Sequence, residues 1–423
     1  MNGREAIAYI HSQQWEKRTP GLHRIRRLLE LLGNPQDGLK FVHVAGTNGK
    51  GSVCACLASM LQSAGYRVGL CTSPYLEDFR ERIQVDRQPI PETELGVLTQ
   101  RVRAAAEQLE ESPSEFELIT AIAMLHFRRS WCHIVVLEVG LGGTLDASNV
   151  ISVPEAAVIT AIGLDHTALL GNTLSEVADA KAGIIKPGGA VVSFGGCPEA
   201  DAVIRRRCQE QGAFLTEMDP SRLTVRSLTP QGSTLEIRPY GPVHLALAGG
   251  YQPANALLAV TTAEVLRSRG WRLPDEAIFR GLSRVTWPGR MELLSSAGPM
   301  ILRDGAHNPQ GMAAAAESIR QLFPGKKVVA VLGIMADKDA AHMLPSLLPL
   351  THQIFTVAPD NPRAMDPEVL AQAIRQQGVP AAACDDVEDA LRRAVSAAGP
   401  DGVVCALGSL YLMGPVRLAV EEL

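Results

Sequence analysis

Runs of apolar residues alternate with amphipathic stretches over the first half of the chain. Five runs are apolar almost throughout, which is the pattern of parallel strands covered on both faces. They span residues 41–45, 67–71, 133–139, 156–161 and 190–194. Apolar residues recur at helical spacing between them, at residues 53–64, 92–109, 115–129 and 173–185. This alternation predicts βαβ units and an open, mostly parallel sheet.

The second half of the chain changes its pattern twice. Residues 213–247 form short alternating segments between Gly/Pro turns, which predict an antiparallel appendage to the first domain. Helical patterns at 253–269 and 274–282 follow, and Trp287-Pro288-Gly289 then breaks the periodicity. A second series of apolar strands lies at residues 300–303, 327–332, 353–358 and 403–407.

This organisation predicts an α/β protein of two domains. The first, residues 1–287, is expected to be a P-loop-containing, open and mostly parallel sheet domain that carries the small antiparallel appendage. The second, residues 288–423, is expected to be a smaller, Rossmann-like α/β domain.

Composition narrows the class of protein. Hydrophobic residues make up 46% and charged residues 20% of the 423 residues, which is ordinary for a globular enzyme. The 40 Lys and Arg residues and 45 Asp and Glu residues give a net charge of −5, so no general attraction to nucleic acid or anionic membranes is expected. The eight cysteines contain no CxxC pair, and neither a secretory leader nor an apolar run of about 18 residues is evident. We expect a cytoplasmic, monomeric enzyme that acts on small molecules.

A glycine-rich loop follows the first apolar strand. Residues 46–52 read GTNGKGS, and a helical pattern begins directly after them. Glycines let several backbone N–H groups point at one anion, the helix N-terminus adds its dipole, and Lys50 supplies positive charge for the β- and γ-phosphates. Gly51 stands where a P-loop usually carries a hydroxyl, and Ser52 follows one position later. The alternative is a glycine turn with a surface lysine. The predicted nucleotide-binding residues are Asn48, Gly49, Lys50, Gly51 and Ser52.

Three further side chains lie near the ends of predicted strands. Glu138 ends a buried strand, where ligands bind in open α/β sheets and where ATP chemistry needs Mg²⁺. His166 lies in a loop after another strand, and Ser73 follows the strand at 67–71. Glu138 is therefore a metal-ligand candidate by position, against the alternative of a capped loop carboxylate. A structural histidine and a serine turn before Pro74 stay open as alternatives for the other two.

Other positions have structural explanations. Lys181 lies on a predicted helix, where a lysine is usually solvated. Ser114 and Glu117 have the spacing of a capping box. Arg290 follows a Trp-Pro turn, as a surface charge would.

The glycine-rich loop resembles the ATP loop of the folylpolyglutamate synthase/dihydrofolate synthase family, within the Mur ligase superfamily. Further segments resemble this family in the same order along the chain: Ser73-Pro74, Phe116-Glu117, Glu138–Gly143, Asp165-His166, Lys181–Gly183, Pro288–Arg290 and Asp304–Pro309. They span nearly the whole chain, and the ordered set is far more specific than any one segment.

The resemblance implies roles that the pattern leaves open. It implies that Ser73, Glu138 and His166 hold Mg²⁺. It also implies that Lys181 is modified to a carbamate, which turns a cation into an anion that can face the metal. Lys50, Lys181 and His307 are the implied catalytic residues, and His307 would face the incoming amino acid.

The resemblance also implies the two binding sets. ATP contacts beyond the P-loop fall on Gln252, Asn255, Arg290 and Asp304. Contacts with a pterin-containing acceptor fall on Phe116, Glu117, Leu145, Asp146 and Ala147, and the Phe116 ring could stack on a flat heterocycle. Two residues depart from the family pattern, because Thr144 replaces an arginine and Tyr251 replaces a histidine.

The implied activity is an ATP-dependent amide ligation. A carboxylate of dihydropteroate or a reduced folate would attack the γ-phosphate of ATP, and the resulting acyl phosphate would be attacked by the amine of L-glutamate, giving ADP and phosphate. Alternatives are a Mur-type ligase acting on another carboxylate, a P-loop small-molecule kinase, or a nucleotide-gated binding protein. A kinase would need no amino acid, and a binding protein would not turn over.

Overall fold

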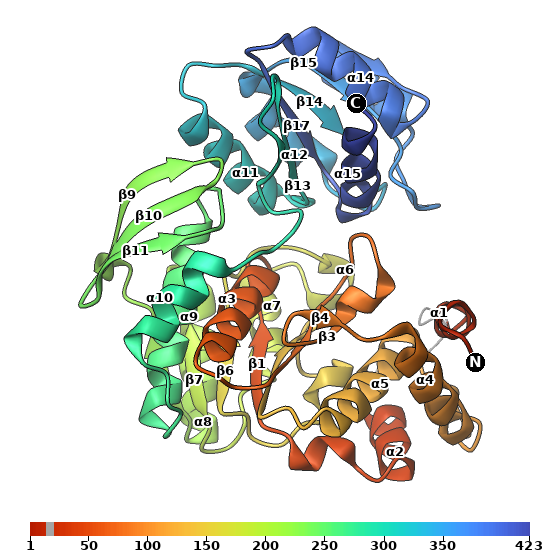
Figure 1. Ribbon diagram of the computed structural model, residues 1–423, viewed down its shortest axis with the longest axis vertical. Helices are drawn as coiled ribbons and strands as arrows, with labels where there is room; N and C mark the ends of the chain where they lie inside the picture. The colour runs from red at the N-terminus through yellow and green to blue at the C-terminus, as the bar shows by residue number, and fades with distance from the viewer. Residues whose placement is uncertain (14–20) are drawn as a thin grey trace. The chain divides into compact units, whose positions relative to one another are not determined.

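The computed structural model describes residues 1–13 and 21–423 (Figure 1). The chain forms two compact units, Met1–Ser221 with Asn255–Arg284, and Arg222–Ala254 with Val285–Leu423. Both are built from helices and mostly parallel sheets, which confirms the predicted α/β class.

The first unit contains an eight-stranded sheet in the order β4-β3-β2-β5-β1-β6-β7-β8. The five predicted strands are confirmed at its centre and pair in parallel with one another, whereas β3 runs antiparallel to β2. The strands are β1 (Phe41–Ala45), β2 (Val68–Cys71), β3 (Ile83–Val85), β4 (Gln88–Pro89), β5 (Ile134–Glu138), β6 (Ala156–Ile159), β7 (Ala190–Ser193) and β8 (Phe214–Glu217). The strand order reverses beside β1, whose parallel neighbours are β5 and β6, and open α/β sheets bind ligands at such a point.

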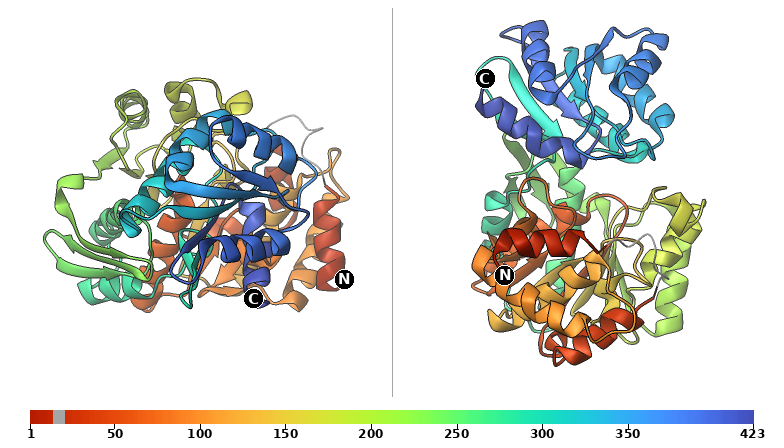
Figure 2. Two further views of the ribbon diagram at one scale, coloured as in Figure 1. Left: turned by 90° about the horizontal axis from the view of Figure 1, so that it is seen from above. Right: turned by 90° about the vertical axis from the view of Figure 1, so that its right-hand side faces the viewer.

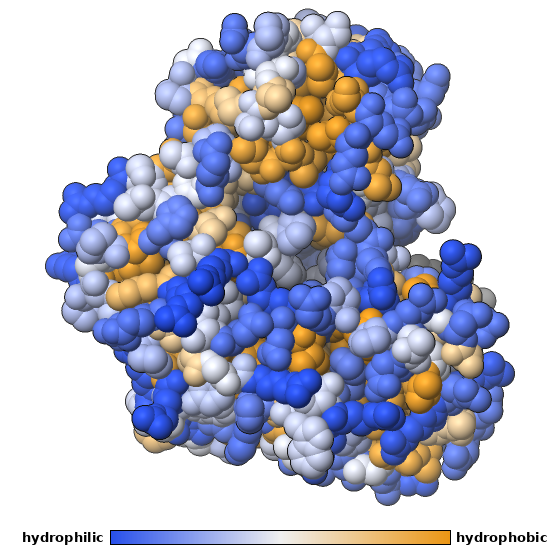
Figure 3. Space-filling model, in the orientation of Figure 1, coloured by the Kyte–Doolittle hydropathy of each residue, from blue (hydrophilic) through white to orange (hydrophobic). Residues whose placement is uncertain are grey.

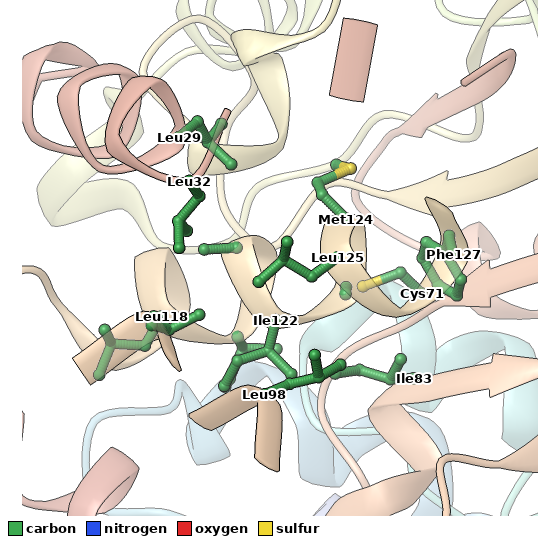
Figure 4. Packing of buried hydrophobic residues seen from close by; sticks show 14 of the residues in the cluster. Leu29, Leu32, Cys71, Ile83, Leu98, Leu118, Ile122, Met124, Leu125 and Phe127 are labelled. Carbon is green, nitrogen blue, oxygen red and sulfur yellow. The ribbon is translucent and has the colours of Figure 1, made fainter. Parts of the chain in front are cut away.

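Helices cover this sheet. They are α1 (Gly3–His11), α2 (His23–Leu31), α3 (Lys50–Ser63), α4 (Glu92–Ala106), α5 (Glu115–Arg129), α6 (Thr167–Leu170), α7 (Leu174–Ala182), α8 (Pro198–Gln211), α9 (Gln252–Ser268) and α10 (Asp275–Arg284). One core lies where α2, α4 and α5 meet β2 and β3, with Leu29, Leu98 and Phe127 among its buried side chains (Figure 4). On α3, the Ser59 hydroxyl donates to the Gly281 carbonyl of α10 at 2.8 Å, and this close approach requires a glycine at 281.

Residues 213–247 differ in part from the prediction. Residues 214–217 form β8, which pairs in parallel with β7 at the edge of the large sheet. The reason is helix α8, which buries Ala200, Ile204 and Cys208 and returns the chain alongside β7 as a crossover. The pattern did not predict α8.

The antiparallel strands follow as a separate three-stranded sheet in the order β11-β10-β9, formed by β9 (Leu223–Thr229), β10 (Gly232–Ile237) and β11 (Gly241–Leu245). By residue contacts alone, this sheet groups with the second compact unit. Ala248, just after β11, packs into the core of that unit beside Met291.

The remainder of the second unit is a six-stranded sheet in the order β12-β13-β17-β14-β15-β16, in which only β12 runs antiparallel. Its strands are β12 (Glu292–Ser295), β13 (Met300–Asp304), β14 (Val328–Leu332), β15 (Thr351–Thr356), β16 (Ala381–Ala383) and β17 (Val403–Leu407). Helices lie on both faces (Figure 2): α11 (Pro309–Leu322), α12 (Ala340–Leu347), α13 (Pro367–Gln376), α14 (Val387–Ala398) and α15 (Met413–Glu421).

The cysteines are free thiols. Seven are buried, and Cys197 is partly exposed. Burial raises the pKa of the Cys56 and Cys405 thiols to about 12, so these groups stay protonated.

Hydrophilic residues and smaller apolar patches share the face of the molecule drawn in Figure 3. Among the described residues, none of the helices combines the length and the apolarity that a membrane span requires.

Candidate functional site

The glycine-rich loop joins the end of β1 to the first turn of α3. A Cβ on Gly46, whose φ is +151°, would lie 1.7 Å from the Thr160 hydroxyl oxygen. Gly49, with φ of +87°, is the N-cap of α3, and a Cβ there would lie 2.5 Å from Oδ1 of Asn255. The loop therefore needs glycine at both positions. The backbone N–H groups in the first turn of α3 have no partner within the helix.

The loop is held by the strand next to it. The Thr47 N–H donates to the Ala161 carbonyl at 2.9 Å, and the Thr160 hydroxyl donates to the Asn48 carbonyl at 2.8 Å. The Thr47 hydroxyl also donates to the Gly163 carbonyl at 2.9 Å. These bonds fix the loop before any ligand arrives, which lowers the ordering cost of binding.

Two lysines converge on one carbonyl of this loop. The Lys50 ammonium donates to the carbonyls of Gly46 and Thr47 at 3.1 and 3.2 Å, and Lys181 donates to the Gly46 carbonyl at 2.9 Å. Lys181 is 5% exposed, so it is not the solvated helical lysine that its sequence context favoured. Burial lowers the pKa of Lys181 to about 7, helped by the charge of Lys50 and opposed by Asp165. Its amine is thus partly neutral near pH 7, and a neutral amine is the form that reacts with CO₂.

The predicted metal ligand Glu138 lies on β5, the strand next to β1. Glu138 ends β5 opposite Val44 of β1 and is 4% exposed. Its carboxylate accepts the Ser73 N–H at 3.1 Å, so the structure brings these two predicted residues together. His166 has a left-handed backbone, with φ of +51°, and its side chain is 45% exposed. Its Nε2 lies 3.9 Å from Oδ1 of Asp165.

The donors Ser73, Glu138 and His166 fit a Mg²⁺ site that is completed by phosphates and waters, and they do not form a site closed by protein ligands alone. Within residues 1–13 and 21–423, no three His, Cys, Asp or Glu side chains gather so that they could hold a metal ion. Mg²⁺ is commonly bound by one or two carboxylates, with substrate phosphates and waters completing its shell. A buried glutamate beside a serine and a phosphate loop fits that pattern.

The predicted acceptor residues fall into two groups. Phe116 packs its ring against Gly140, where a Cβ would lie 2.7 Å from the ring. Glu117 is 4% exposed and forms the predicted capping box with Ser114, and its carboxylate also accepts from Arg24 Nε at 3.3 Å. The contacts of Glu117 are thus internal to the fold.

The second group follows the Gly-Gly turn. Leu145 is 56% exposed, whereas Asp146 and Ala147 are buried. The Asp146 carboxylate accepts the N–H groups of Leu141 and Ser148, both at 2.9 Å. The Thr144 hydroxyl, at a position where the family carries arginine, donates to the Ala180 carbonyl at 3.1 Å and so ties this turn to α7.

A buried chain of side chains supports this turn and was missed from the sequence. The Ser148 hydroxyl donates to Asp146 and lies 2.9 Å from Nε2 of His43 on β1. His43 is fully buried, and burial together with the charge of Lys186 lowers its pKa to about 3, so its imidazole is neutral. The one available signal was a histidine inside an apolar strand just before the phosphate loop.

The second unit has its own cluster of predicted residues. Oδ1 of Asp304 accepts the Ala306 N–H at 2.8 Å, and Oδ2 accepts the Met291 N–H at 2.9 Å and the Tyr251 hydroxyl. Nδ1 of His307 lies 2.8 Å from the Gly305 carbonyl. Tyr251 had no assigned role from the sequence.

Comparisons with known proteins give one consistent result. Residues 44–263 match the Mur ligase middle domain, and residues 289–410 match the Mur ligase glutamate ligase domain. The folylpolyglutamate synthase of Lacticaseibacillus casei is 37% identical, over 99% of this chain and 98% of its own. The dihydrofolate synthase/folylpolyglutamate synthase of Bacillus subtilis is 36% identical, over 98% of each. An Escherichia coli structure in complex with DHPP and ADP is 28% identical with a TM-score of 0.88, covering 100% of this chain and 98% of its own.

Proposed function

Because the chain belongs to the folylpolyglutamate synthase/dihydrofolate synthase family of Mur ligases and is an ATP-dependent ligase, we propose that it joins L-glutamate to dihydropteroate, to reduced folates, or to both. The observation that carries the proposal is the geometry at the end of β1. A preordered phosphate loop, two lysines and a buried glutamate meet there. The names of the relatives and the DHPP bound to the Escherichia coli protein support the choice of acceptor.

In the proposed reaction, the acceptor carboxylate attacks the γ-phosphate of ATP and ADP leaves. The N–H groups at the start of α3 and the Lys50 ammonium stabilise the charge that develops on the transferred phosphoryl group. Lys50 is already held over the loop by the carbonyls of Gly46 and Thr47, so little reorganisation is needed. The glutamate amine then attacks the acyl phosphate, and the amide forms as phosphate leaves.

We assign the Mg²⁺ of this reaction to Ser73, Glu138 and His166, of which the first two are hydrogen-bonded neighbours. When bound, the metal would neutralise phosphate charge. Asn48, Gly49, Gly51, Ser52, Asn255, Arg290 and Asp304 are the further residues assigned to ATP. Phe116, Glu117, Leu145, Asp146 and Ala147 are assigned to the acceptor, and His307 to glutamate.

We also propose that Lys181 carries a carbamate in the active enzyme. Its amine has the lowered pKa that the reaction with CO₂ requires, and it lies at the loop rather than in solvent. The modification would replace one of two neighbouring cations by an anion, which removes their mutual repulsion.

The test is an ADP-release assay with each acceptor, with and without L-glutamate. We expect ADP formation that needs both substrates, with one amide formed per ATP. Oxygen label in the acceptor carboxylate should appear in the released phosphate, because that oxygen leaves with the phosphoryl group. AMP as product would reject the acyl-phosphate route. ADP formation only with another carboxylate acceptor would keep the ligase chemistry and reject the folate assignment.

A further inference from the structure

Asp304 is a buried carboxylate whose three hydrogen-bond donors are neutral groups, with the charge of Arg290 acting on it from nearby. It is 3% exposed, and it accepts two backbone N–H groups, from Ala306 and Met291, at 2.8 and 2.9 Å. The Tyr251 hydroxyl is the third donor and the only side chain of the three. A buried carboxylate with few charged partners depends strongly on each hydrogen bond it receives.

These bonds hold the turn that carries Arg290. Met291, directly after Arg290, donates its N–H to Asp304. Gly289, directly before Arg290, donates to the Glu292 carboxylate at 2.7 Å and accepts the Gly305 N–H at 2.8 Å. The guanidinium lies over Gly305, since a Cβ there would come 2.9 Å from Arg290 NH1.

Tyr251 is well placed to act on this turn. Its ring packs against the core that contains Met291, and it lines Gly249, where a Cβ would lie 3.3 Å from the ring. The ring is therefore held by packing, and the hydroxyl is directed at a fixed carboxylate. The hydroxyl adds a hydrogen bond without adding a charge that would repel the Arg290 guanidinium.

We propose that Tyr251 is a positioning residue for nucleotide binding: its hydroxyl holds Asp304 in the orientation that fixes residues 289–291, the turn that carries Arg290. This rests on the proposed assignment of Arg290 to ATP. Tyr251 stands where the family resemblance leads us to expect a histidine.

The test is Tyr251→Phe, which removes only the hydroxyl and keeps the ring that packs in the core. We expect KM for ATP to rise about tenfold, which corresponds to about 1.4 kcal/mol, because the turn that carries Arg290 loses one of the bonds that hold it. KM for the acceptor should change less than twofold, and the melting temperature should fall, because a buried carboxylate loses one donor. Tyr9→Phe is the matched control. It also removes one tyrosine hydroxyl, on helix α1 of the first unit, and should leave KM for ATP unchanged.

A double-mutant cycle with Asp304→Asn gives the second readout. If Tyr251 acts through Asp304, the double variant should be no worse than Asp304→Asn alone. Additive losses, an unchanged KM for ATP in Tyr251→Phe, or a loss spread equally over all substrates would overturn the proposal.

Equilibrium binding of a non-hydrolysable ATP analogue separates this idea from the proposed reaction. The tenfold weakening by Tyr251→Phe is expected in that measurement whether or not the protein ligates glutamate to a folate. A wild-type protein that binds the analogue but makes no folate amide would reject the acceptor assignment and leave the Tyr251 test intact.

Discussion

Two loops of the molecule make the same strand–loop–helix connection, but cationic groups gather in one and a carboxylate lies in the other. Each joins the end of a buried parallel strand to the start of a fourteen-residue helix, β1 to α3 in the first unit and β13 to α11 in the second. In the first loop, two ammonium groups converge on a backbone carbonyl. In the second loop, backbone N–H groups and a hydroxyl converge on a carboxylate.

The N-termini of α3 and α11 also differ in how their backbone N–H groups are capped. The α3 helix begins after Gly49, which has no side chain to cap it. The α11 helix begins after Asn308, whose side chain accepts the Gly311 N–H at 2.7 Å, and Pro309 removes another donor. The first terminus is therefore open to a phosphate, whereas the second is already satisfied by its own chain. Identical strand–loop–helix topology thus supports an anion site in one unit and a self-capped turn in the other.

The largest expected effect is at the open loop. Lys50→Ala removes the cation held over the phosphate site, and turnover should fall by about 10²–10³-fold or more. Steady-state kinetics checks this, with Lys327→Ala, an exposed lysine of the second unit, as the control. Near-normal turnover in a folded Lys50→Ala protein would end the assignment of this loop to phosphate.

Lys181→Ala tests whether the second lysine serves as an anion. We expect a large loss of turnover, with partial recovery when acetate is added, because a small carboxylate can occupy the vacated position. The same acetate should not restore Lys50→Ala, which lacks a cation. A plain ammonium seen by NMR on Lys181 in the active, nucleotide-bound enzyme would contradict the carbamate.

Metal dependence should belong to residues of the first unit alone. Glu138→Ala and His166→Ala should raise the Mg²⁺ concentration needed for half-maximal rate, by about tenfold or more at Glu138. His342→Ala, an exposed histidine of the second unit, is the control for His166. If neither variant changes the Mg²⁺ dependence, these residues do not hold the metal.

Substitutions at the two N-cap residues, Asn308 and Gly49, test whether the N-termini of α11 and α3 have different roles. Asn308→Ala should cost about 1 kcal/mol of unfolding free energy through the lost cap, measured by urea denaturation. Its effect on KM for ATP should be small. Gly49→Ala places a methyl group 2.5 Å from Oδ1 of Asn255 at a left-handed φ and should weaken ATP binding. Equal effects of both changes on ATP binding would mean that the two termini serve the same purpose.

The last expectation concerns the dependence of stability on pH, which rests on the single amine of Lys181. The pKa of Lys181 falls from 10.5 when exposed to about 7 in the fold, so between these values the unfolded chain binds one more proton than the folded chain. Stability therefore gains up to about 1.4 kcal/mol per pH unit from this group as pH rises through that window. Lys181→Met should lose this contribution, and unfolding measured from pH 7 to pH 10 in CO₂-free buffer should show a shallower slope. An unchanged slope would place the amine in water.

The sequence predicted what is local. The buried strands were found because a parallel strand covered on both faces is apolar along its whole length. The glycine-rich turn between β1 and α3 and the Ser114–Glu117 capping box were found because each needs particular residues within a few positions. The same locality explains why α8 was missed, since its charged surface weakens the apolar periodicity.

Contacts between distant residues could not be predicted in this way. His43 and Ser148 are 105 residues apart, and Tyr251 and Asp304 are 53 apart. The burial of Lys181 follows from the Gly46 loop, 135 residues earlier, and no helix pattern records it.

The buried cysteines can report local unfolding of each unit, because their thiols react only when they become exposed. Cys197 alone among the eight cysteines is partly exposed, so a thiol reagent should label the native chain there first. Cys56 lies on α3, behind the phosphate loop, and Cys405 lies on β17, beside β13. Each can react only after its own unit opens, because a protonated, buried thiol is inert. Labelling of these two sites, followed by peptide mass, would time the opening of the two units separately within one intact chain.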